Sequence, residues 1–431
     1  MFGASIVILM IVFLFLGMPV AFALGSAGVI GLYIFGGTDA VFSILGTVPY
    51  RSAAHYTLST LPMFILMAQF ISASKIVDDI FVAAQRWLEQ LPGGLAITTI
   101  FAAAGMAAMS GSSTASAATL STMAVPQMVK HGYSRSIATG VVTVAGTLAI
   151  MIPPSIAFVL YGIITETSIG KLLIAGIIPG ILTAAMYCLG ILIWSKAAPG
   201  SMPSSTNMYS WKDRFDSLKT LWPFLILASI VIGSMYSGLA TPTEAAALGA
   251  FGSLVIPVAL GRMARKDFST AVVSAMRSTT MIFTIIIGAM IFGYFLTITE
   301  STQHLIGYIG GLQMDRWFIM IAIIIMYLIL GCVMDQVAII LVTLPMVFPL
   351  VMHLGFDPIW FGVIITKTAE IGMATPPVGM NAFVVSATTK VPLEEVFKGA
   401  WPLIAVDMVS LALLLAFPFL STWLPSTMMG S

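Results

Sequence analysis

Charged residues are scarce in this chain: Asp, Glu, Lys and Arg make up 8% of its 431 residues, while hydrophobic residues make up 59%. Soluble domains typically contain about a quarter charged residues. The net charge of only +1 also offers no basic surface that nucleic acid could bind. The composition therefore predicts a polytopic protein that spans the lipid bilayer, with no nucleic-acid partner.

The sequence also has little of the chemistry that enzymes use. Cys188 and Cys332 are its two cysteines and lie far apart, which excludes a disulfide framework. A Walker A loop, an HExxH helix and a GxSxG elbow are absent, and the four histidines are widely separated. We therefore expect no enzymatic activity, no transition-metal centre and no organic cofactor. The N-terminus lacks the features of a secretory signal and is expected to be a retained first helix.

An internal repeat is visible when the chain is aligned with itself at an offset of 223 residues. The aligned prolines, far more than chance gives for a chain with 22 prolines, are Pro19 with Pro242, Pro126 with Pro349, Pro153 with Pro376, Pro154 with Pro377, and Pro179 with Pro402. Matches at one fixed period indicate repeated structure. The sequence thus predicts two related halves.

Most apolar stretches of the first half have the length of membrane-spanning helices. These stretches are 3–17, 19–36, 57–73, 135–166 (interrupted at Pro153-Pro154) and 171–195. Residues 75–90 are predicted to form an amphipathic helix at the membrane interface. Segment 93–129 is hydrophobic but broken at SGSS, which predicts two half-length helices in a re-entrant hairpin, and 314–352 is its counterpart.

Five crossings and one hairpin make an odd number of crossings per half, so the second half should be inverted relative to the first. Inverted repeats with broken helices are a transporter architecture. If the N-terminus lies outside the cell, the loop cations on the outer side are only Arg51, Lys171 and Arg316, and the other loop cations are cytoplasmic. The positive-inside rule requires such a distribution. We therefore predict an all-α polytopic membrane protein with both termini periplasmic.

The expected domain organisation follows from this plan. The predicted segments are scaffold helices at 1–56, a spanning helix and interfacial arm at 57–91, the first half of the transport domain at 92–195, a cytoplasmic connector at 196–220, scaffold helices at 221–277, a spanning helix and arm at 278–313, and the second half of the transport domain at 314–431.

The first hairpin tip combines small hydroxyl side chains with a predicted break in the helix. Ser110, Ser112, Ser113, Thr114 and Ser116 supply hydroxyls, and unwound backbone would add carbonyl oxygens. Hard cations such as Na⁺ prefer several oxygen ligands. Pro153 lacks an N–H and frees a carbonyl one turn earlier, which favours a site. Alternatively, these small residues merely allow close helix packing.

The second half repeats the arrangement with different side chains. Asp335 lies within the second hairpin, where an ionisable side chain normally faces a cavity, a cation or a partner. The alternative is that its carboxylate caps the outgoing helix. Lys367 and Glu370 stand three residues apart and could neutralise each other, whereas Asp407 in the last long apolar stretch has no evident partner.

At these motifs the chain resembles the large membrane subunit of the tripartite ATP-independent periplasmic (TRAP) transporters. The residues that carry the resemblance along the whole chain are GSSTASAATLSTMAVPQM (111–128), IPPSIAFVLYG (152–162), GLATPTEAAALGA (238–250), GCVMDQVAIILVTLPMVFP (331–349) and TPPVGMNAF (375–383). The resemblance implies an elevator-type transporter of the bacterial inner membrane, driven by a sodium gradient. It also implies a periplasmic substrate-binding protein that delivers an organic acid anion, such as sialic acid or a C4-dicarboxylate, and a separate small four-helix membrane subunit.

The resemblance further implies two Na⁺ sites. One would use Ser110, Ser112, Ala149, Ile152 and Pro154, and the other Gly331, Met334, Gly372, Thr375 and Pro377. The residues expected to serve substrate binding or coupling are Ser113, Thr114, Ser116, Ser155, Asp335, Gly379 and Asn381.

Two alternative functions remain open at this point. A stand-alone ion-coupled carboxylate carrier would share the two-hairpin plan without a binding protein. An intramembrane aspartyl enzyme would pair Asp335 with a second acid such as Glu370, although the first hairpin supplies no acid.

Overall fold

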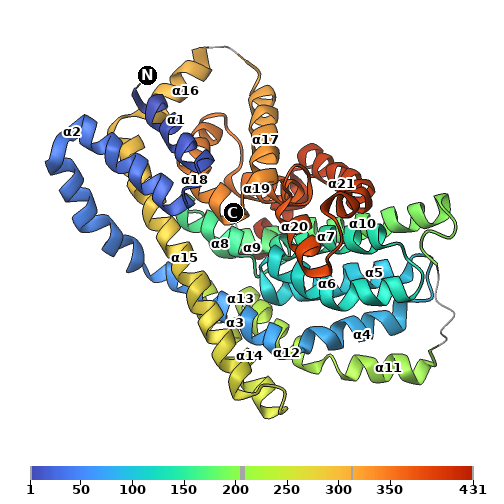
Figure 1. The fold of residues 1–431 in the computed structure, drawn as a ribbon. Helices are drawn as coiled ribbons and strands as arrows, with labels where there is room; N and C mark the ends of the chain where they lie inside the picture. Colours follow the sequence, from blue (N-terminus) through green and yellow to red (C-terminus); the bar gives the residue numbers. More distant parts are fainter. Residues whose placement is uncertain (1, 204–208, 312–313, 430–431) are drawn as a thin grey trace.

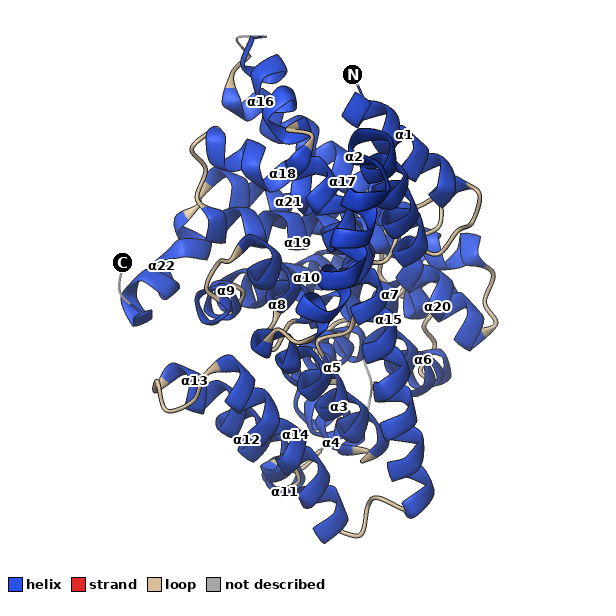
Figure 2. Ribbon diagram, turned by 90° about the vertical axis from the view of Figure 1, so that its left-hand side faces the viewer, coloured by secondary structure: helices blue, strands red, loops and turns tan. Residues whose placement is uncertain are grey.

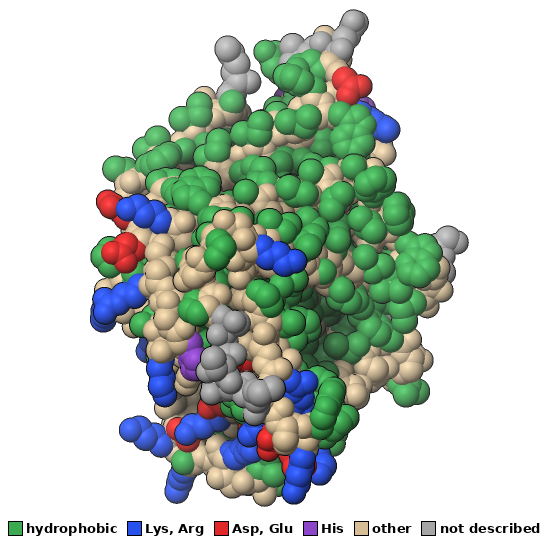
Figure 3. All heavy atoms as spheres, turned by 90° about the vertical axis from the view of Figure 1, so that its right-hand side faces the viewer, with side chains coloured by type: hydrophobic (Ala, Val, Ile, Leu, Met, Phe, Trp, Pro, Cys, Tyr) green, Lys and Arg blue, Asp and Glu red, His purple; other side chains and the backbone are tan. Residues whose placement is uncertain are grey.

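The computed structural model describes residues 2–203, 209–311 and 314–429, and the regular secondary structure of that part of the chain consists of helices joined by loops (Figures 1 and 2). Eight of its helices are long and apolar enough to cross a membrane, or up to ten if each of two bent helix pairs forms one span. The space-filling view shows a largely hydrophobic upper and right-hand surface, with most of the visible charged side chains along the left edge and at the bottom (Figure 3). This distribution is that of a multi-pass membrane protein.

The helix bounds follow the 223-residue offset of the prolines. Helix α6 (Ser113–Lys130) corresponds at both ends to α18 (Gln336–His353), and α7 (Arg135–Met151) to α19 (Pro358–Ala374). Within one residue the same holds for α5 (Gly94–Ser110) with α17 (Arg316–Val333), and for α8 (Ile156–Thr165) with α20 (Met380–Thr389). The two halves therefore repeat their helices as well as their prolines.

The helix interruptions lie where the sequence places them. Hairpin 1, formed by α5 and α6, turns at Gly111 and Ser112, and hairpin 2, formed by α17 and α18, turns at Met334 and Asp335. The first break, 152–155, bends α7 against α8 by 41°. The second break, 375–379, separates α19 from α20.

The expected half-length of the hairpin helices is wrong. Helix α5 has 17 residues, and α6, α17 and α18 have 18 residues each. At about 1.5 Å per residue such helices are roughly 27 Å long, close to the thickness of the hydrocarbon core. The SGSS interruption marks only where the chain turns, and it does not shorten the helices on either side.

One expected boundary agrees with the structure and another is wrong. The range of α2 (Val20–Ala53) holds two helical segments that meet at Gly37, whose φ of 69° and ψ of −164° are not helical, so the end expected at residue 36 agrees with the backbone. Helix α15 (Arg265–Ile298) runs through residue 278, where a new helix was expected. Arg277 interrupts the apolar run there, but arginine is a good helix former and leaves the backbone intact.

The remaining helices complete the two halves. They are α1 (Phe2–Phe15), α3 (Thr60–Ala73), α4 (Ile76–Leu88), α9 (Ile169–Ala175), α10 (Ile177–Ala197), α11 (Trp211–Lys219), α12 (Trp222–Ala228), α13 (Ser234–Tyr236), α14 (Pro242–Ala259), α16 (Ser301–Gly311), α21 (Leu393–Ala416) and α22 (Phe419–Met429). Helix α4 buries Ile76, Val77, Ile80 and Phe81 on one face, which confirms the predicted amphipathic helix. In Figure 1, α2 and α15 cross on one side of the molecule, away from α10 and α21.

Candidate functional site

The tip of hairpin 1 rests against the first helix break. Gly111 has a left-handed backbone (φ 58°), and a Cβ atom there would lie 2.6 Å from the Pro154 carbonyl oxygen. Only glycine fits this conformation and this contact. The Ser112 hydroxyl accepts the Ala115 N–H at 3.5 Å and so caps α6. The predicted site residues Ser110 and Ser112 of hairpin 1 therefore lie close to Pro154 of the first break.

The first break leaves backbone oxygen atoms available. Pro153 has no N–H for the Ala149 carbonyl, which would be its partner in a continuous helix. The Ser155 hydroxyl accepts the Phe158 N–H at 3.4 Å and begins α8. Ser116 is fully buried beside the tip, and its hydroxyl lies 2.9 Å from that of Ser110.

The tip of hairpin 2 meets the second break in the same way. The Gly379 N–H donates to the Cys332 carbonyl at 3.0 Å. Helices α17 and α19 approach so closely that a Cβ on Gly372 would lie 2.5 Å from the Gly331 Cα. The Thr375 N–H donates to the Gly372 carbonyl at 2.9 Å, and its hydroxyl donates to Ile371 at 2.7 Å. The backbone near Gly331, Gly372 and Thr375 is thus brought together.

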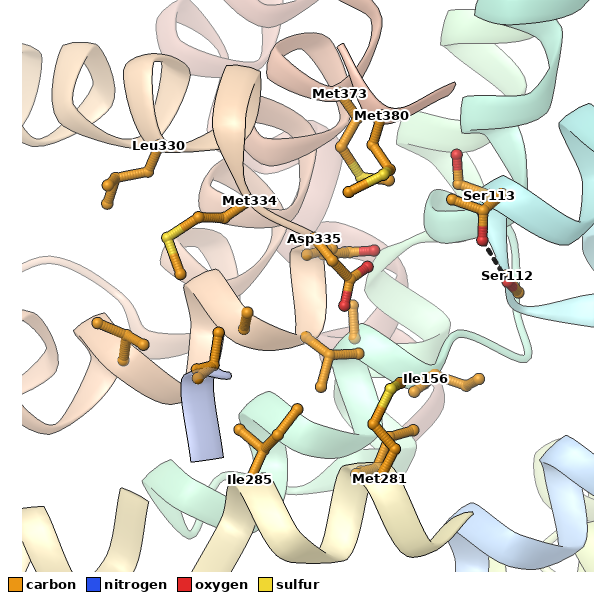
Figure 4. A pocket seen from close by; sticks show the side chains of 18 of the residues that line it. Ser112, Ser113, Ile156, Met281, Ile285, Leu330, Met334, Asp335, Met373 and Met380 are labelled. Atoms are coloured by element: carbon orange, nitrogen blue, oxygen red, sulfur yellow. Dashed lines mark hydrogen bonds between the residues drawn. The ribbon is translucent and has the colours of Figure 1, made fainter. Parts of the chain in front are cut away.

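Both hairpin tips line one cavity of about 1520 Å³. Residues 110–115 form part of its wall, and Met334, Asp335 and Gln336 form another part. Helix α15 contributes Met281 and Ile285, which the close-up shows across the cavity from Asp335 (Figure 4). Of the described residues that line the cavity, Asp335 is the one with a charged side chain. Most of the residues of α1 and α15 that line the cavity are ordinary apolar side chains without a recognisable sequence motif, so the sequence did not identify them.

Asp335 is the N-cap residue of α18 and lines this cavity. Its carboxylate lies close to the N–H groups of residues 336–338. Asp335 therefore occupies the helix-capping position that the sequence suggested and also belongs to the cavity wall. A carboxylate at the edge of a mostly apolar cavity attracts cations and repels anions.

Two residues expected to face the substrate lie behind the cavity wall. Ser155 and Asn381 are both fully buried and do not belong to the cavity lining. The Asn381 amide donates to the Ser113 hydroxyl and, at 3.4 Å, to the Thr143 carbonyl. Asn381 therefore connects α20 to hairpin 1 and α7 in this conformation, whereas Ser113 and Thr114 line the cavity.

Asp407, for which the sequence suggested no partner, belongs to a buried cluster of charged side chains. The Lys367 ammonium contacts Asp407 of α21 and lies 3.5 Å from the Glu370 carboxylate. Glu370 also accepts the Thr147 hydroxyl of α7 at 2.7 Å. The pairing of Lys367 with Glu370 was predicted from their spacing, but Asp407 provides the closer contact.

Comparison with known proteins decides the family. A family model described as the DctM component of tripartite ATP-independent periplasmic transporters matches residues 7–420. The chain belongs to this family. As a DctM-family protein it is a TRAP transporter permease for organic solutes, a multi-pass membrane protein and not an enzyme, which excludes the intramembrane aspartyl enzyme.

Relatives of this DctM-family chain cover nearly its whole length. It is 35% identical over 405 residues to the C4-dicarboxylate TRAP transporter large permease protein DctM of Pseudomonas aeruginosa, covering 94% of each chain. It is 29% identical to the sialic acid TRAP transporter large permease protein SiaM of Vibrio cholerae, covering 97% of each. It is 33% identical to the isethionate TRAP transporter permease protein DctMQ of Oleidesulfovibrio alaskensis, over 96% of this chain and 64% of that protein.

Solved structures share the fold at low sequence identity. The YdaH transporter of Alcanivorax borkumensis superposes with a TM-score of 0.61 at 12% identity, covering 88% of this chain and 89% of that one. MtrF of Neisseria gonorrhoeae superposes with a TM-score of 0.59 at 14% identity, covering 96% and 94%. These likenesses concern the fold alone.

Proposed function

We propose that this permease takes up an organic acid anion by an elevator mechanism driven by a Na⁺ gradient. The observation that supports this most is the convergence of both hairpin tips and their adjoining helix breaks around one cavity. Two repeated half-sites at discontinuous helices suit coupled binding of ions and substrate. The hairpins and broken helices would move together, while the scaffold helices of 1–56 and 221–277 stay fixed.

Two Na⁺ ions would bind as co-transported cargo, one near each hairpin tip. Near the first tip, Ser110, Ser112, Ala149, Ile152 and Pro154 supply hydroxyl and carbonyl oxygens. Helix C-terminal ends are negative, and α5 and α7 both end at this place. The second ion would use the equivalent set Gly331, Met334, Gly372, Thr375 and Pro377. The negative charge of Asp335 would favour cation occupancy, so we assign Asp335 to coupling.

The substrate anion would bind where the first turn of α6 faces the cavity. The N-termini of helices attract anions through free N–H groups and the helix dipole, and Ser113 and Thr114 belong to this turn. Ser116, Ser155, Gly379 and Asn381 would hold the surrounding backbone in place. A C4-dicarboxylate is the first substrate to test, because relatives at 35% and 33% identity carry that name; sialic acid is the second.

The permease would work with a periplasmic substrate-binding protein and a small four-helix membrane subunit in the bacterial inner membrane. Membership in a tripartite family supports two partners, and DctMQ of the Oleidesulfovibrio relative is named as one protein. The two halves would be inverted in the membrane, with both termini periplasmic, an orientation that the distribution of loop cations supports.

Uptake by proteoliposomes tests this proposal directly. The permease is reconstituted with its small subunit and supplied with the binding protein loaded with a radiolabelled C4-dicarboxylate or sialic acid. We expect uptake only when both the binding protein and an inward Na⁺ gradient are present. Equal uptake from a K⁺ medium of the same ionic strength would refute sodium coupling, and uptake of free substrate would favour the stand-alone carrier.

Substitutions at the two hairpin tips test the site. We expect Asp335→Ala and Ser112→Ala each to raise the Na⁺ concentration needed for half-maximal uptake by about tenfold or more, as expected for losing a polar contact to a charged ligand. Asp39→Ala removes an exposed carboxylate of α2 and serves as the control. Unchanged Na⁺ dependence in both tip variants would remove the site assignment.

A further inference from the structure

Helix α11, in the connector between the halves, carries a continuous stripe of exposed apolar side chains. Trp211, Phe215 and Leu218 are 66%, 55% and 40% exposed, and Trp222 at the start of α12 is 43% exposed. The spacing of four and three residues places Trp211, Phe215 and Leu218 on one face of α11, and Trp222 begins the next helix beyond a bend of 47°. A soluble connector would not be expected to leave such a face in water.

The apolar stripe formed by Trp211, Phe215, Leu218 and Trp222 continues into the segment Trp222–Tyr236, and α11 and this segment together are long and apolar enough to cross a membrane, with a bend between them. Leu225 and Ile226 of α12 are 53% and 43% exposed and follow Trp222 by three and four residues. The stripe is thus continuous with exposed apolar side chains of α12.

The side chains around this stripe suit the boundary between lipid and water. Lys212, Arg214 and Lys219 flank it, together with Asp213 and Asp216. The Arg214 guanidinium lies 5.0 Å from the centre of the Trp211 ring. Tryptophan and basic side chains concentrate at this depth, where an apolar body and a polar end are both accommodated.

Helix α11 is also firmly attached to the interfacial helix α4. Arg86 donates to the Asp213 carbonyl at 3.1 Å, Trp87 donates to the Arg214 carbonyl at 3.2 Å, and Arg214 donates to Gln90 at 2.8 Å. Just before α11, the Tyr209 hydroxyl donates to Glu89 at 3.0 Å. Burial, together with Glu89, raises the pKa of Tyr209 to about 12, so this hydroxyl keeps its proton.

We propose that α11 lies in the cytoplasmic headgroup region of the bilayer and binds phospholipid through the apolar stripe. The helix would anchor the end of α4, which leads directly into hairpin 1. The lipid contact itself does not depend on the proposed transport function, whereas the anchoring role in an elevator does.

Accessibility of spin labels to oxygen and to a water-soluble nickel chelate tests the contact. The permease and its small subunit are reconstituted in phosphatidylcholine and phosphatidylglycerol nanodiscs, with a nitroxide attached to Leu218→Cys. We expect high oxygen and low nickel accessibility, close to that of Leu225→Cys in the spanning segment. Lys212→Cys on the flanking polar side should show the reverse. Labelled wild-type protein supplies the background from Cys188 and Cys332.

Two results would overturn the proposal. High nickel accessibility at Leu218→Cys, equal to that at Lys212→Cys, would place the stripe in water. Low accessibility to both probes would mean that protein covers it, either the small subunit or a second copy. A second measurement needs no cysteine: phospholipids brominated near the headgroup should quench Trp211, and Trp211→Phe should lose that part of the quenching. Equal quenching in both proteins would contradict lipid contact even if Leu218→Cys failed to fold.

Discussion

Lys367→Met should destabilise the permease more than any other single substitution considered for this chain. Lys367 and Glu370 are 0% exposed and Asp407 is 2% exposed, so removing the ammonium leaves two buried carboxyl groups without a cation. Removing one partner of a buried ion pair costs about 3–5 kcal/mol. We expect a markedly lower melting temperature for the purified protein and a reduced yield of folded protein after gel filtration.

The double variant Lys367→Met with Asp407→Leu provides the matched comparison. It replaces both members of the closest pair with apolar side chains of similar volume, so that one buried carboxyl group, that of Glu370, is left without a cation instead of two. We expect it to be more stable than Lys367→Met alone, which a double-mutant cycle measures as a coupling energy. Equal loss in the single and double variants would show that lost packing, and not an unpaired charge, causes the destabilisation.

The sequence allowed the positions of both helix breaks to be predicted because local chemistry determines them. Pro153-Pro154 and Pro376-Pro377 each place two residues without an N–H donor in succession, which strongly favours an interruption of the helix at these positions. Ser112 begins α6 for an equally local reason, since its hydroxyl caps the helix. The repeat then related the two breaks without any knowledge of tertiary contacts.

The partners of the buried groups could not be predicted, because they depend on how distant helices pack. Asp407 meets Lys367 across 40 residues of sequence, and Asn381 meets Ser113 across 268 residues. The spacing of Lys367 and Glu370 suggested that they neutralise each other within α19. A spacing along one helix cannot predict a contact with Asp407 on α21. For the same reason, the sequence could not show that Asn381 and Ser155, which are expected to serve substrate binding or coupling, are buried in this conformation.

Gly372→Ala should separate hairpin 2 from α19 and abolish coupled uptake. Its new methyl group would lie 2.5 Å from the Gly331 Cα and 2.9 Å from the Leu328 carbonyl oxygen. Both obstacles are backbone atoms, so no side chain can rotate away, and overpacking of this kind costs about 1–3 kcal/mol. We expect little uptake at any Na⁺ concentration, together with a moderate loss of thermal stability.

Gly293→Ala in α15 controls for the general effect of replacing glycine in a membrane helix. A Cβ atom at Gly293 meets nothing within 4 Å, so this variant should keep its stability and uptake. Gly372→Ala retains the same carbonyl oxygen that would ligate Na⁺, so a selective loss must come from the spacing of α17 and α19. If both variants transport equally well, the close approach of these helices is dispensable, and the second Na⁺ site cannot depend on it.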